Sequence, residues 1–202
     1  MIRSKKELAF YIKADSMMNR GYFNPSMSER LKRLFVRDEI MCFLRILRKC
    51  QYYNQMGGVK SIYYRYKYLK ISKRLGFSLG CNVFGYGLVI PHYGTIVVGE
   101  SNRCGNYCVL HTSTCITDNG KQIGDAFYLS TGAKITSKVV IGDNVSVGAN
   151  SVVNKSFEEG NIMIAGSPAK YIKNSDAWYV RDGQTYISRV NAVEKLKREM
   201  GI

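Results

Sequence analysis

A six-residue spacing of apolar side chains runs through the middle of this 202-residue chain. One step, from Ile116 to Ile123, is seven residues long, and the six-residue spacing then resumes. A period of six matches neither the 3.6 residues of an α-helix nor the two residues of a strand. It predicts a triangular β-coil of three short sides per turn, with turns stacked about 4.8 Å apart. The ten positions are Val98, Cys104, Leu110, Ile116, Ile123, Leu129, Ile135, Ile141, Val147 and Val153.

The residues four places after these positions are mostly small, for example Thr114, Ala133 and Ser151. Two inward side chains share each corner of a tight coil, and both cannot be bulky. An antiparallel sandwich with glycine-rich turns is the competing fold. It does not explain why ten positions keep one register through an insertion.

Composition restricts the class of protein. Hydrophobic residues make up 46% of the chain, enough for one core with an appendage. No apolar run approaches the roughly 20 residues of a membrane span, and the first ten residues lack the apolar centre of a signal peptide. We therefore expect a cytoplasmic protein. The six cysteines form no CxxC pair, so we expect neither a zinc knuckle nor a disulfide framework.

The positive charge is concentrated in the first third of the chain. Residues 1–76 hold 18 Lys and Arg against 5 Asp and Glu, whereas residues 77–202 hold 12 against 10. Helix signals predict one helix from Ser4 to Gly21, a second from Ser26 to Gly57 and a third ending at Gly76.

The third of these helices carries an alternating Tyr, Lys and Arg run over residues 63–68. Three interpretations remain open: a helical face packed on the coil, a surface for an anionic ligand or an anionic membrane, and a nucleic-acid surface. No nucleic-acid motif accompanies the run, so we expect no nucleic-acid partner.

The chain has two histidines, His92 and His111, which are nineteen residues apart. One coil turn is about eighteen residues, so both are expected near one edge of consecutive turns. An incidental, structural role is the alternative, but the shared edge favours a site.

Two segments carry a resemblance to a known family. Residues 87–100, which include Pro91, His92 and Tyr93, are similar to the catalytic segment of serine O-acetyltransferases. Residues 165–170 are similar to the Ala-Gly-x-Pro-Ala-Lys/Arg signature that closes the coil of hexapeptide-repeat acyltransferases. The helical leader and residues 109–111 look most like the branch found in capsule and exopolysaccharide pathways. The resemblance covers about residues 77 to 173.

The resemblance implies a mainly β fold: a left-handed parallel β-helix with an N-terminal α-helical segment, assembled as a homotrimer. The expected division is 1–76 (basic helical region), 77–173 (β-helix) and 174–202 (tail). We expect the tail to form a hairpin around Asp182–Gly183 and a short helix over residues 191–200, and to cap the open end of the coil.

The resemblance also assigns roles. His92 stands where the general base of the family stands, and an imidazole with a pKa near 6.5 can take a hydroxyl proton at neutral pH. Acetyl-CoA would be the co-substrate, with no metal and no acyl-cysteine. His111 is expected to orient His92 or to bind the acceptor, within the chain or across the trimer interface. Glu100 is a weaker candidate for the same role, and Tyr93 is expected on the substrate side.

Five further positions align with the family's cofactor channel. Thr131, Gly132 and Ala149 align with the positions that line the pantetheine arm, and Pro168 and Lys170 match the nucleotide end, where a lysine meets phosphate. Gly132 and Ala149 have an equal claim to be simple turn residues.

The chain also departs from serine acetyltransferases. Pro91 replaces the aspartate before the catalytic histidine, and Phe77 aligns with the aspartate that orients it. Residues 119–121 are too short to supply that family's second active-site histidine. These losses put a serine acceptor in doubt.

Two classes of function therefore stay open. The first is an O-acetyltransferase acting on a sugar hydroxyl of a cell-surface polysaccharide precursor, with serine as the alternative acceptor and a peripheral contact of residues 1–76 with the inner face of the membrane. The second is a non-catalytic β-helical scaffold. A β-helical carbonic anhydrase is excluded because two histidines cannot supply three zinc ligands.

Overall fold

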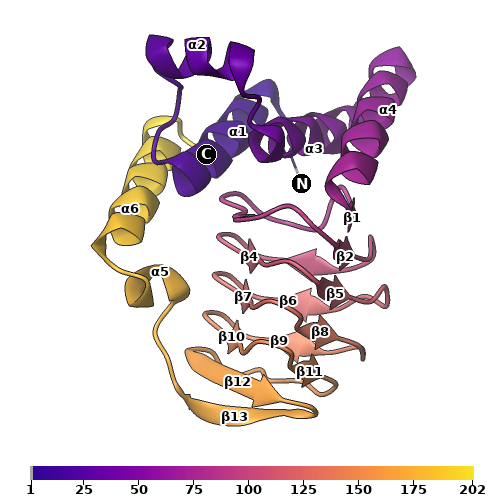
Figure 1. The fold of residues 1–202 in the computed structure, drawn as a ribbon, viewed down its shortest axis with the longest axis vertical. Helices are drawn as coiled ribbons and strands as arrows, with labels where there is room; N and C mark the ends of the chain where they lie inside the picture. The colour runs from indigo at the N-terminus through magenta and orange to yellow at the C-terminus, as the bar shows by residue number, and fades with distance from the viewer. Residues whose placement is uncertain (1) are drawn as a thin grey trace.

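The computed structural model describes residues 2–202, with the side chains of residues 30, 33 and 34 left aside. A stacked β-coil forms the body of the molecule, with helices over its first turn and along one side (Figure 1). The helices are α1 (Lys5–Arg20), α2 (Met27–Phe35), α3 (Glu39–Met56), α4 (Gly58–Leu75), α5 (Trp178–Arg181) and α6 (Gln184–Glu199).

The strands of the coil are short because each spans only one side of a turn. They are β1 (Phe77–Leu79), β2 (Ile96–Val98), β3 (Arg103–Cys104), β4 (Val109–Leu110), β5 (Thr114–Ile116), β6 (Gln122–Ile123), β7 (Tyr128–Leu129), β8 (Lys134–Ile135), β9 (Val140–Ile141), β10 (Ser146–Val147), β11 (Val152–Val153), β12 (Ile162–Gly166) and β13 (Ala169–Asn174).

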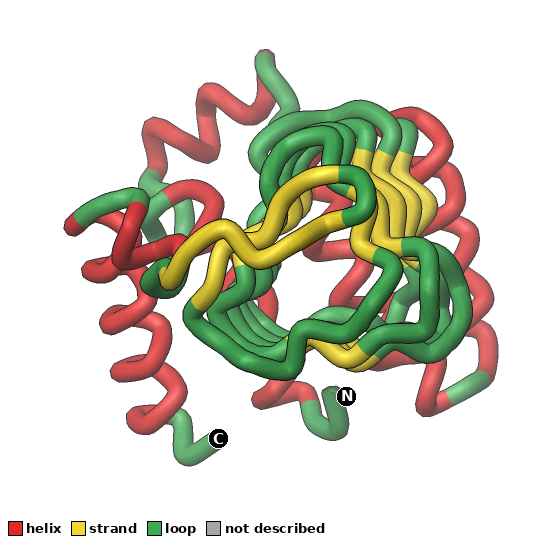
Figure 2. The backbone as a smooth tube through the Cα atoms, turned by 90° about the horizontal axis from the view of Figure 1, so that it is seen from below, coloured by secondary structure: helices red, strands yellow, loops and turns green. Residues whose placement is uncertain are grey.

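These strands stack into three sheets, one for each side of the coil, as Figure 2 shows from the end. Their orders are β1-β2-β5-β8-β11, β3-β6-β9 and β4-β7-β10-β12-β13. All pairings are parallel except β12 with β13, which is antiparallel. The chain is therefore a parallel β-helix with an N-terminal helical segment, and the predicted fold class is confirmed.

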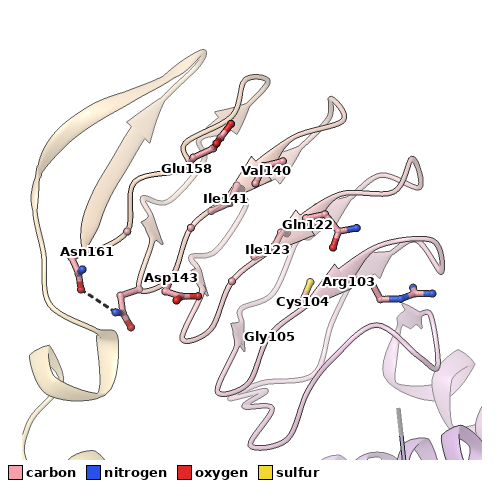
Figure 3. Close-up of a pocket in the computed structure, with 14 residues that line it drawn as sticks. Arg103, Cys104, Gly105, Gln122, Ile123, Val140, Ile141, Asp143, Glu158 and Asn161 are labelled. Atoms are coloured by element: carbon pink, nitrogen blue, oxygen red, sulfur yellow. Dashed lines mark hydrogen bonds between the residues drawn. The ribbon is translucent and has the colours of Figure 1, made fainter.

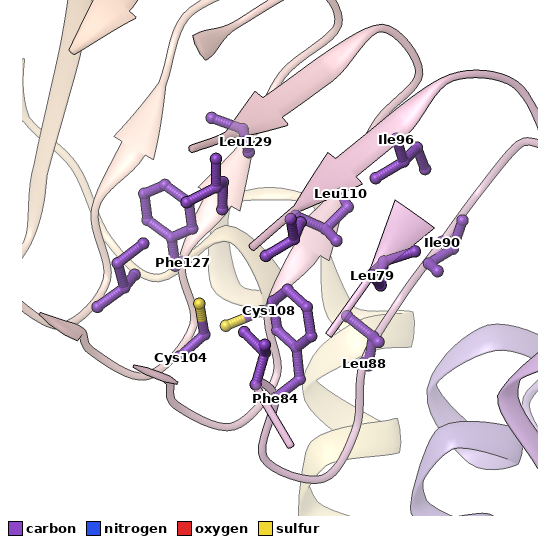
Figure 4. Packing of buried hydrophobic residues seen from close by; sticks show 14 of the residues in the cluster. Leu79, Phe84, Leu88, Ile90, Ile96, Cys104, Cys108, Leu110, Phe127 and Leu129 are labelled. Carbon is purple, nitrogen blue, oxygen red and sulfur yellow. The ribbon is translucent and has the colours of Figure 1, made fainter. Parts of the chain in front are cut away.

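The six-residue positions point inward, as predicted. Val98 pairs with Ile116, and Ile116 pairs with Ile135, so these side chains stack turn upon turn. All ten positions are buried. Figure 4 shows part of this core, in which Cys104 and Cys108 lie among aliphatic and aromatic side chains. Burial raises the pKa of the Cys108 thiol to about 12, so it packs as a small neutral group.

The seven-residue step is absorbed at one corner by a buried lysine. Lys121 is fully buried, and its Nζ donates to the Thr117 carbonyl oxygen (2.6 Å), to Thr117 Oγ1 (2.8 Å) and to Asn119 Oδ1. Burial lowers the pKa of this amino group. The extra residue is thus stored in a hydrogen-bonded bend, and Ile123 returns to register opposite Cys104.

The predicted second helix is wrong in extent, because it is two helices. α2 ends at Phe35, and α3 begins after Asp38, whose Oδ1 accepts from the Met41 backbone N–H (3.1 Å). Arg20 also binds the Asp38 carboxylate (2.7 Å). The Asp38 carboxylate caps the N-terminus of α3 and is held there by Arg20 of α1. Asp38 is therefore more favourable as the start of a new helix than as an interior residue of one long helix.

One buried ion pair joins the helical segment to the first turn of the coil. The side chains of Arg48 in α3 and Asp15 in α1 are 0% and 1% exposed, with Nε 2.7 Å from Oδ2 and Nη2 3.0 Å from Oδ1. The guanidinium also donates to the carbonyl oxygens of Phe84 (2.9 Å) and Gly85 (2.6 Å), and Asp15 accepts from the Leu88 N–H (3.0 Å).

The prediction for the tail is corrected. Asp182 and Gly183 separate α5 from α6 and form no hairpin, and α6 packs against α1 along the side of the coil (Figure 1). Apolar side chains of the tail, such as Trp178 and Val193, bury themselves with residues of α1 and of the coil. The β12–β13 hairpin, and not the tail, lies at the open end (Figure 2).

No helix within residues 2–202 is both long enough and apolar enough to cross a membrane.

Arg48→Ala is expected to destabilise the fold by about 3–5 kcal/mol, because it leaves the Asp15 carboxylate buried without its partner. Urea unfolding followed by circular dichroism measures the loss. Arg74→Ala is the matched control, since its pair with Glu39 is half exposed (52% and 29%) and worth less than about 1 kcal/mol. Equal losses of stability in Arg48→Ala and Arg74→Ala would contradict the larger contribution that we assign to the buried ion pair. The double variant Asp15→Leu/Arg48→Met should recover only part of the stability, because it removes both charges but leaves the Leu88 N–H and the carbonyl oxygens of Phe84 and Gly85 without these partners.

Candidate active site

Most of the predicted site residues lie along one corner of the coil, and Glu100 is the exception. This corner lies between the β4-β7-β10 side and the β2-β5-β8 side. Backbone hydrogen bonds stack its turns: the Gly132 N–H donates to the Thr112 carbonyl oxygen (3.1 Å), and the Asn150 N–H donates to the Thr131 carbonyl oxygen (2.9 Å). His92, His111, Thr131 and Ala149 therefore follow one another on four consecutive turns. The prediction that the two histidines share an edge agrees with this placement.

His92 is exposed on the loop that enters β2, and helices hold this loop at both ends. Before it, Asn19 of α1 accepts from the Ile90 N–H (3.2 Å) and donates to the Leu88 carbonyl oxygen (2.8 Å). After it, the Gly94 N–H donates to the carbonyl oxygen of Leu75, the last residue of α4 (3.0 Å). The imidazole thus extends from a fixed loop into solvent.

His111 lies one turn further along the corner and is only partly exposed. Its ring is 5.1 Å from the Tyr128 ring, and its Nε2 is buried without a hydrogen-bond partner among residues 2–202. Burial lowers the pKa of His111, the nearby charge of His92 lowers it further, and Asp182 opposes both. Burial and the neighbouring His92 therefore disfavour the protonated form of His111.

The tail forms a wall beside His111, and this role was missed from the sequence. Arg181 donates to Ser146 Oγ (2.9 Å) and lies 4.8 Å from the centre of the Tyr128 ring. Trp178 Nε1 donates to the Tyr107 carbonyl oxygen (2.8 Å). Tyr128, Arg181 and Asp182 carried no signal because they are outward or non-periodic positions.

The remaining corner residues could hold an extended ligand. Thr131 and Ala149 are exposed, as are Pro168 and Lys170 beyond them, near the turn between β12 and β13. Four turn spacings separate the level of His92 from that turn, about 19 Å in all. An exposed corner of this length, with a lysine at its far end, fits a pantetheine arm that ends in phosphates.

Gly132 has a second, structural reason to be glycine. Its φ is +75°, and a Cβ there would lie 2.0 Å from Asn150 Oδ1. The expectation that it is a turn residue therefore holds beside its predicted cofactor role.

The other two predicted residues fall in different places. Tyr93 is 72% exposed, next to His92. Glu100 lies at another corner, where its Cα is 2.5 Å from the position of a Cβ on Gly80. It lines a hollow with Arg65 and Tyr68 of α4. Within one chain, Glu100 does not face His92.

A groove of about 700 Å³ lies on the β3-β6-β9 face, away from this corner (Figure 3). None of the predicted site residues lines it. The carboxylates nearby hold turns together: Asp143 Oδ1 accepts from the Asp125 N–H, and Asp125 Oδ1 from the Asn106 N–H, each at 2.7 Å. We interpret these side chains as structural.

No group of three or more His, Cys, Asp or Glu side chains among residues 2–202 is arranged to hold a metal ion.

We predict that His111 titrates below the usual histidine range and that its two charged neighbours move its pKa in opposite directions. His92→Gln should raise the pKa of His111 by removing a like charge, and Asp182→Asn should lower it. Imidazole NMR titration of this two-histidine chain measures both shifts. Because the folded-state pKa is the lower one, stability should fall as pH drops from about 6.5, the unfolded value. A pKa of His111 unchanged in both variants would refute the proposed environment.

Comparison with known proteins places this architecture. Residues 120–155 match the family model described as "Bacterial transferase hexapeptide (six repeats)". A serine acetyltransferase from Synechococcus elongatus is 31% identical over 98 residues, which are 45% of this chain and 40% of that protein. The chain thus matches less than half the length of that curated relative.

Solved structures share the fold. The serine acetyltransferase of Neisseria gonorrhoeae superposes with a TM-score of 0.65 and 22% identity, covering 85% of this chain and 69% of that one. A serine acetyltransferase in complex with CoA gives a TM-score of 0.61 and 20% identity, covering 83% and 69%. The chain therefore contains a segment that matches a bacterial transferase hexapeptide model, and it is similar to serine acetyltransferases over part of its sequence and in fold.

Proposed function

We propose that this protein is an acetyl-CoA-dependent O-acetyltransferase that moves the acetyl group directly to an acceptor hydroxyl, with His92 as the general base. The observation that carries the proposal is an exposed imidazole on a doubly anchored loop, at the head of a corner long enough for CoA. The similarity to serine acetyltransferases supports the same chemistry.

Different residues of the chain have different roles in the proposed reaction. Acetyl-CoA, when bound, supplies an activated acetyl group on a good leaving group. His92 takes the proton of the acceptor hydroxyl as that oxygen attacks, and returns a proton to the departing thiolate. A neutral His111 keeps the corner free of a second positive charge while His92 carries the proton. Thr131, Gly132, Ala149, Pro168 and Lys170 would position the cofactor.

Serine is the acceptor that the relatives favour. One observation supports a second candidate: the side chains expected to serve an amino-acid acceptor are absent. Pro91 stands directly before His92, where serine acetyltransferases have an aspartate, so this position offers no carboxylate to an ammonium group. A sugar hydroxyl, as in the capsule and exopolysaccharide branch, carries no ammonium group and needs no such partner.

An assembly and a location are part of the proposal. A homotrimer would place the exposed corner of one subunit beside its neighbour and close the cleft that a single chain leaves open. We place the protein in the cytoplasm, with residues 1–76 in contact with the inner face of the membrane when the acceptor is a lipid-linked sugar.

His92→Ala should lower kcat/KM by roughly 10²–10⁴-fold, the usual contribution of a general base. Thiol release from acetyl-CoA, followed with serine and with a panel of nucleotide sugars, measures the activity and identifies the acceptor. His111→Gln is the companion variant, expected to change the acceptor KM or the pH profile more than the limiting rate. If the wild-type protein binds no CoA at all, the result would favour a non-catalytic scaffold. Full activity in His92→Ala would show that His92 is not the general base.

Lys170→Ala should raise the KM for acetyl-CoA roughly ten-fold, because a charged contact to phosphate is lost. Lys173→Ala is the control, since it removes the same charge from the same strand three residues away. The acceptor KM should not change in either variant. If both lysines have equal effects, the contact is only general electrostatic attraction.

A further inference from the structure

The outer face of α4 is apolar and exposed. Val59, Ile62, Tyr66 and Leu69 recur at intervals of three and four residues and are between 47% and 83% exposed. The opposite face of the helix, with Ile71 among its residues, is buried against α3 and the first turn of the coil. The four exposed residues, termed the α4 stripe, therefore do not serve the fold of a single chain.

A strongly basic hollow lies beside the α4 stripe. It measures about 760 Å³, lies between α3 and α4, and contains one carboxylate, that of Asp38. Glu39 nearby pairs with Arg37 (3.7 Å) and with Arg74. Positive charge remains in clear excess. The cations that line the hollow are Arg37, Arg45, Lys49, Lys67, Lys70 and Arg74.

The α4 stripe and the basic hollow together indicate which kind of partner binds this face. A soluble phosphate would fill the hollow but leave the α4 stripe in water, and a nucleic-acid backbone would do the same. An anionic bilayer offers phosphates and an apolar layer a few ångströms apart, which matches both features. Tyr63 and Tyr66 add rings with polar tips, which suit the boundary between headgroups and acyl chains.

The length of α4 also fits a helix lying in the plane of a membrane. Its 18 residues extend over about 27 Å. Lys67 and Lys70 follow the flank of the stripe, so the lysine side chains can reach headgroup phosphates while the apolar residues enter the boundary.

We propose that α4 docks this protein on an anionic lipid surface, with the α4 stripe in the headgroup boundary and lipid phosphates in the basic hollow. The inference specifies the membrane contact proposed above and names the residues that make it. It does not depend on acetyl transfer, because neither the stripe nor the hollow includes a residue of the corner that holds His92.

Co-sedimentation of the full chain with vesicles of phosphatidylglycerol and phosphatidylcholine tests the docking. Lys67→Glu/Lys70→Glu should weaken binding by roughly 30-fold or more, since each basic residue near such a surface contributes about 1 kcal/mol. The matched control is Lys138→Glu/Lys195→Glu, which makes the same charge change at exposed lysines of the coil and α6 and should change binding less than about two-fold.

A second double variant tests the contribution of the apolar α4 stripe. Ile62→Ser/Leu69→Ser should reduce vesicle binding while leaving its salt dependence intact, and Val180→Ser, an exposed apolar residue of α5, should have no effect. Circular dichroism confirms that the variants fold. Equal binding to vesicles of phosphatidylcholine alone, or no binding to anionic vesicles, would overturn the proposal.

Two further outcomes would also overturn it. Binding of inorganic pyrophosphate in the hollow without vesicle binding would reveal a site for a free anion. A change of oligomeric state in Ile62→Ser/Leu69→Ser, seen by sedimentation velocity, would show that a second copy covers the stripe. Thiol release with a soluble acceptor is measured in the same variants and should not change. Docking without thiol release in the wild type would refute the acetyltransferase and leave the docking face standing.

Discussion

The buried guanidinium of Arg48 is the interaction on which the rest of the structure depends. Placing an ion pair out of water costs several kcal/mol per charge, and only dense hydrogen bonding offsets that cost. Here the carboxylate of Asp15 and the carbonyl oxygens of Phe84 and Gly85 surround it, while Asp15 also accepts from the Leu88 N–H. Apolar side chains could fill the same space, but they would not fix two helices and a particular pair of carbonyls at once. The pair therefore sets the orientation of the helices on the first turn.

The orientation of the helices affects the candidate site because α1 and α4 bind backbone groups on both sides of His92. Leu88, held by Asp15, is four residues before His92, and Asn19 of the same helix holds Ile90. The far end of the loop is held at Leu75 by α4. The helical segment thus supports the loop that carries His92, the proposed general base.

The parts of the fold that the sequence predicts well are those with a strong packing constraint. Each inward position must fit between the turns above and below, so Val98 to Val153 could be placed without a structure. The break at Lys121 shows the limit: the spacing reveals that a residue is inserted, but not that a buried amino group binds the bend. The same holds for the split between α2 and α3, which depends on Asp38 meeting Arg20 across the fold, and for the tail, whose aromatic residues have no period. In the site, the shared edge of His92 and His111 was predictable from the coil period, whereas Tyr128 and Arg181 were not, because outward positions follow no spacing.

The end of α4 links the proposed membrane contact to the loop that carries His92. The last carbonyl of that helix, at Leu75, accepts the hydrogen bond that anchors the His92 loop, so a membrane-docked α4 would hold the catalytic loop at a fixed height above the lipid. A free amino acid gains nothing from such a placement. A sugar on a lipid carrier does, because its hydroxyl is confined to a thin layer and the local concentration at the loop rises accordingly. The docking face and the missing carboxylate at Pro91 therefore favour the same acceptor, although they lie on different elements and follow from different physical causes.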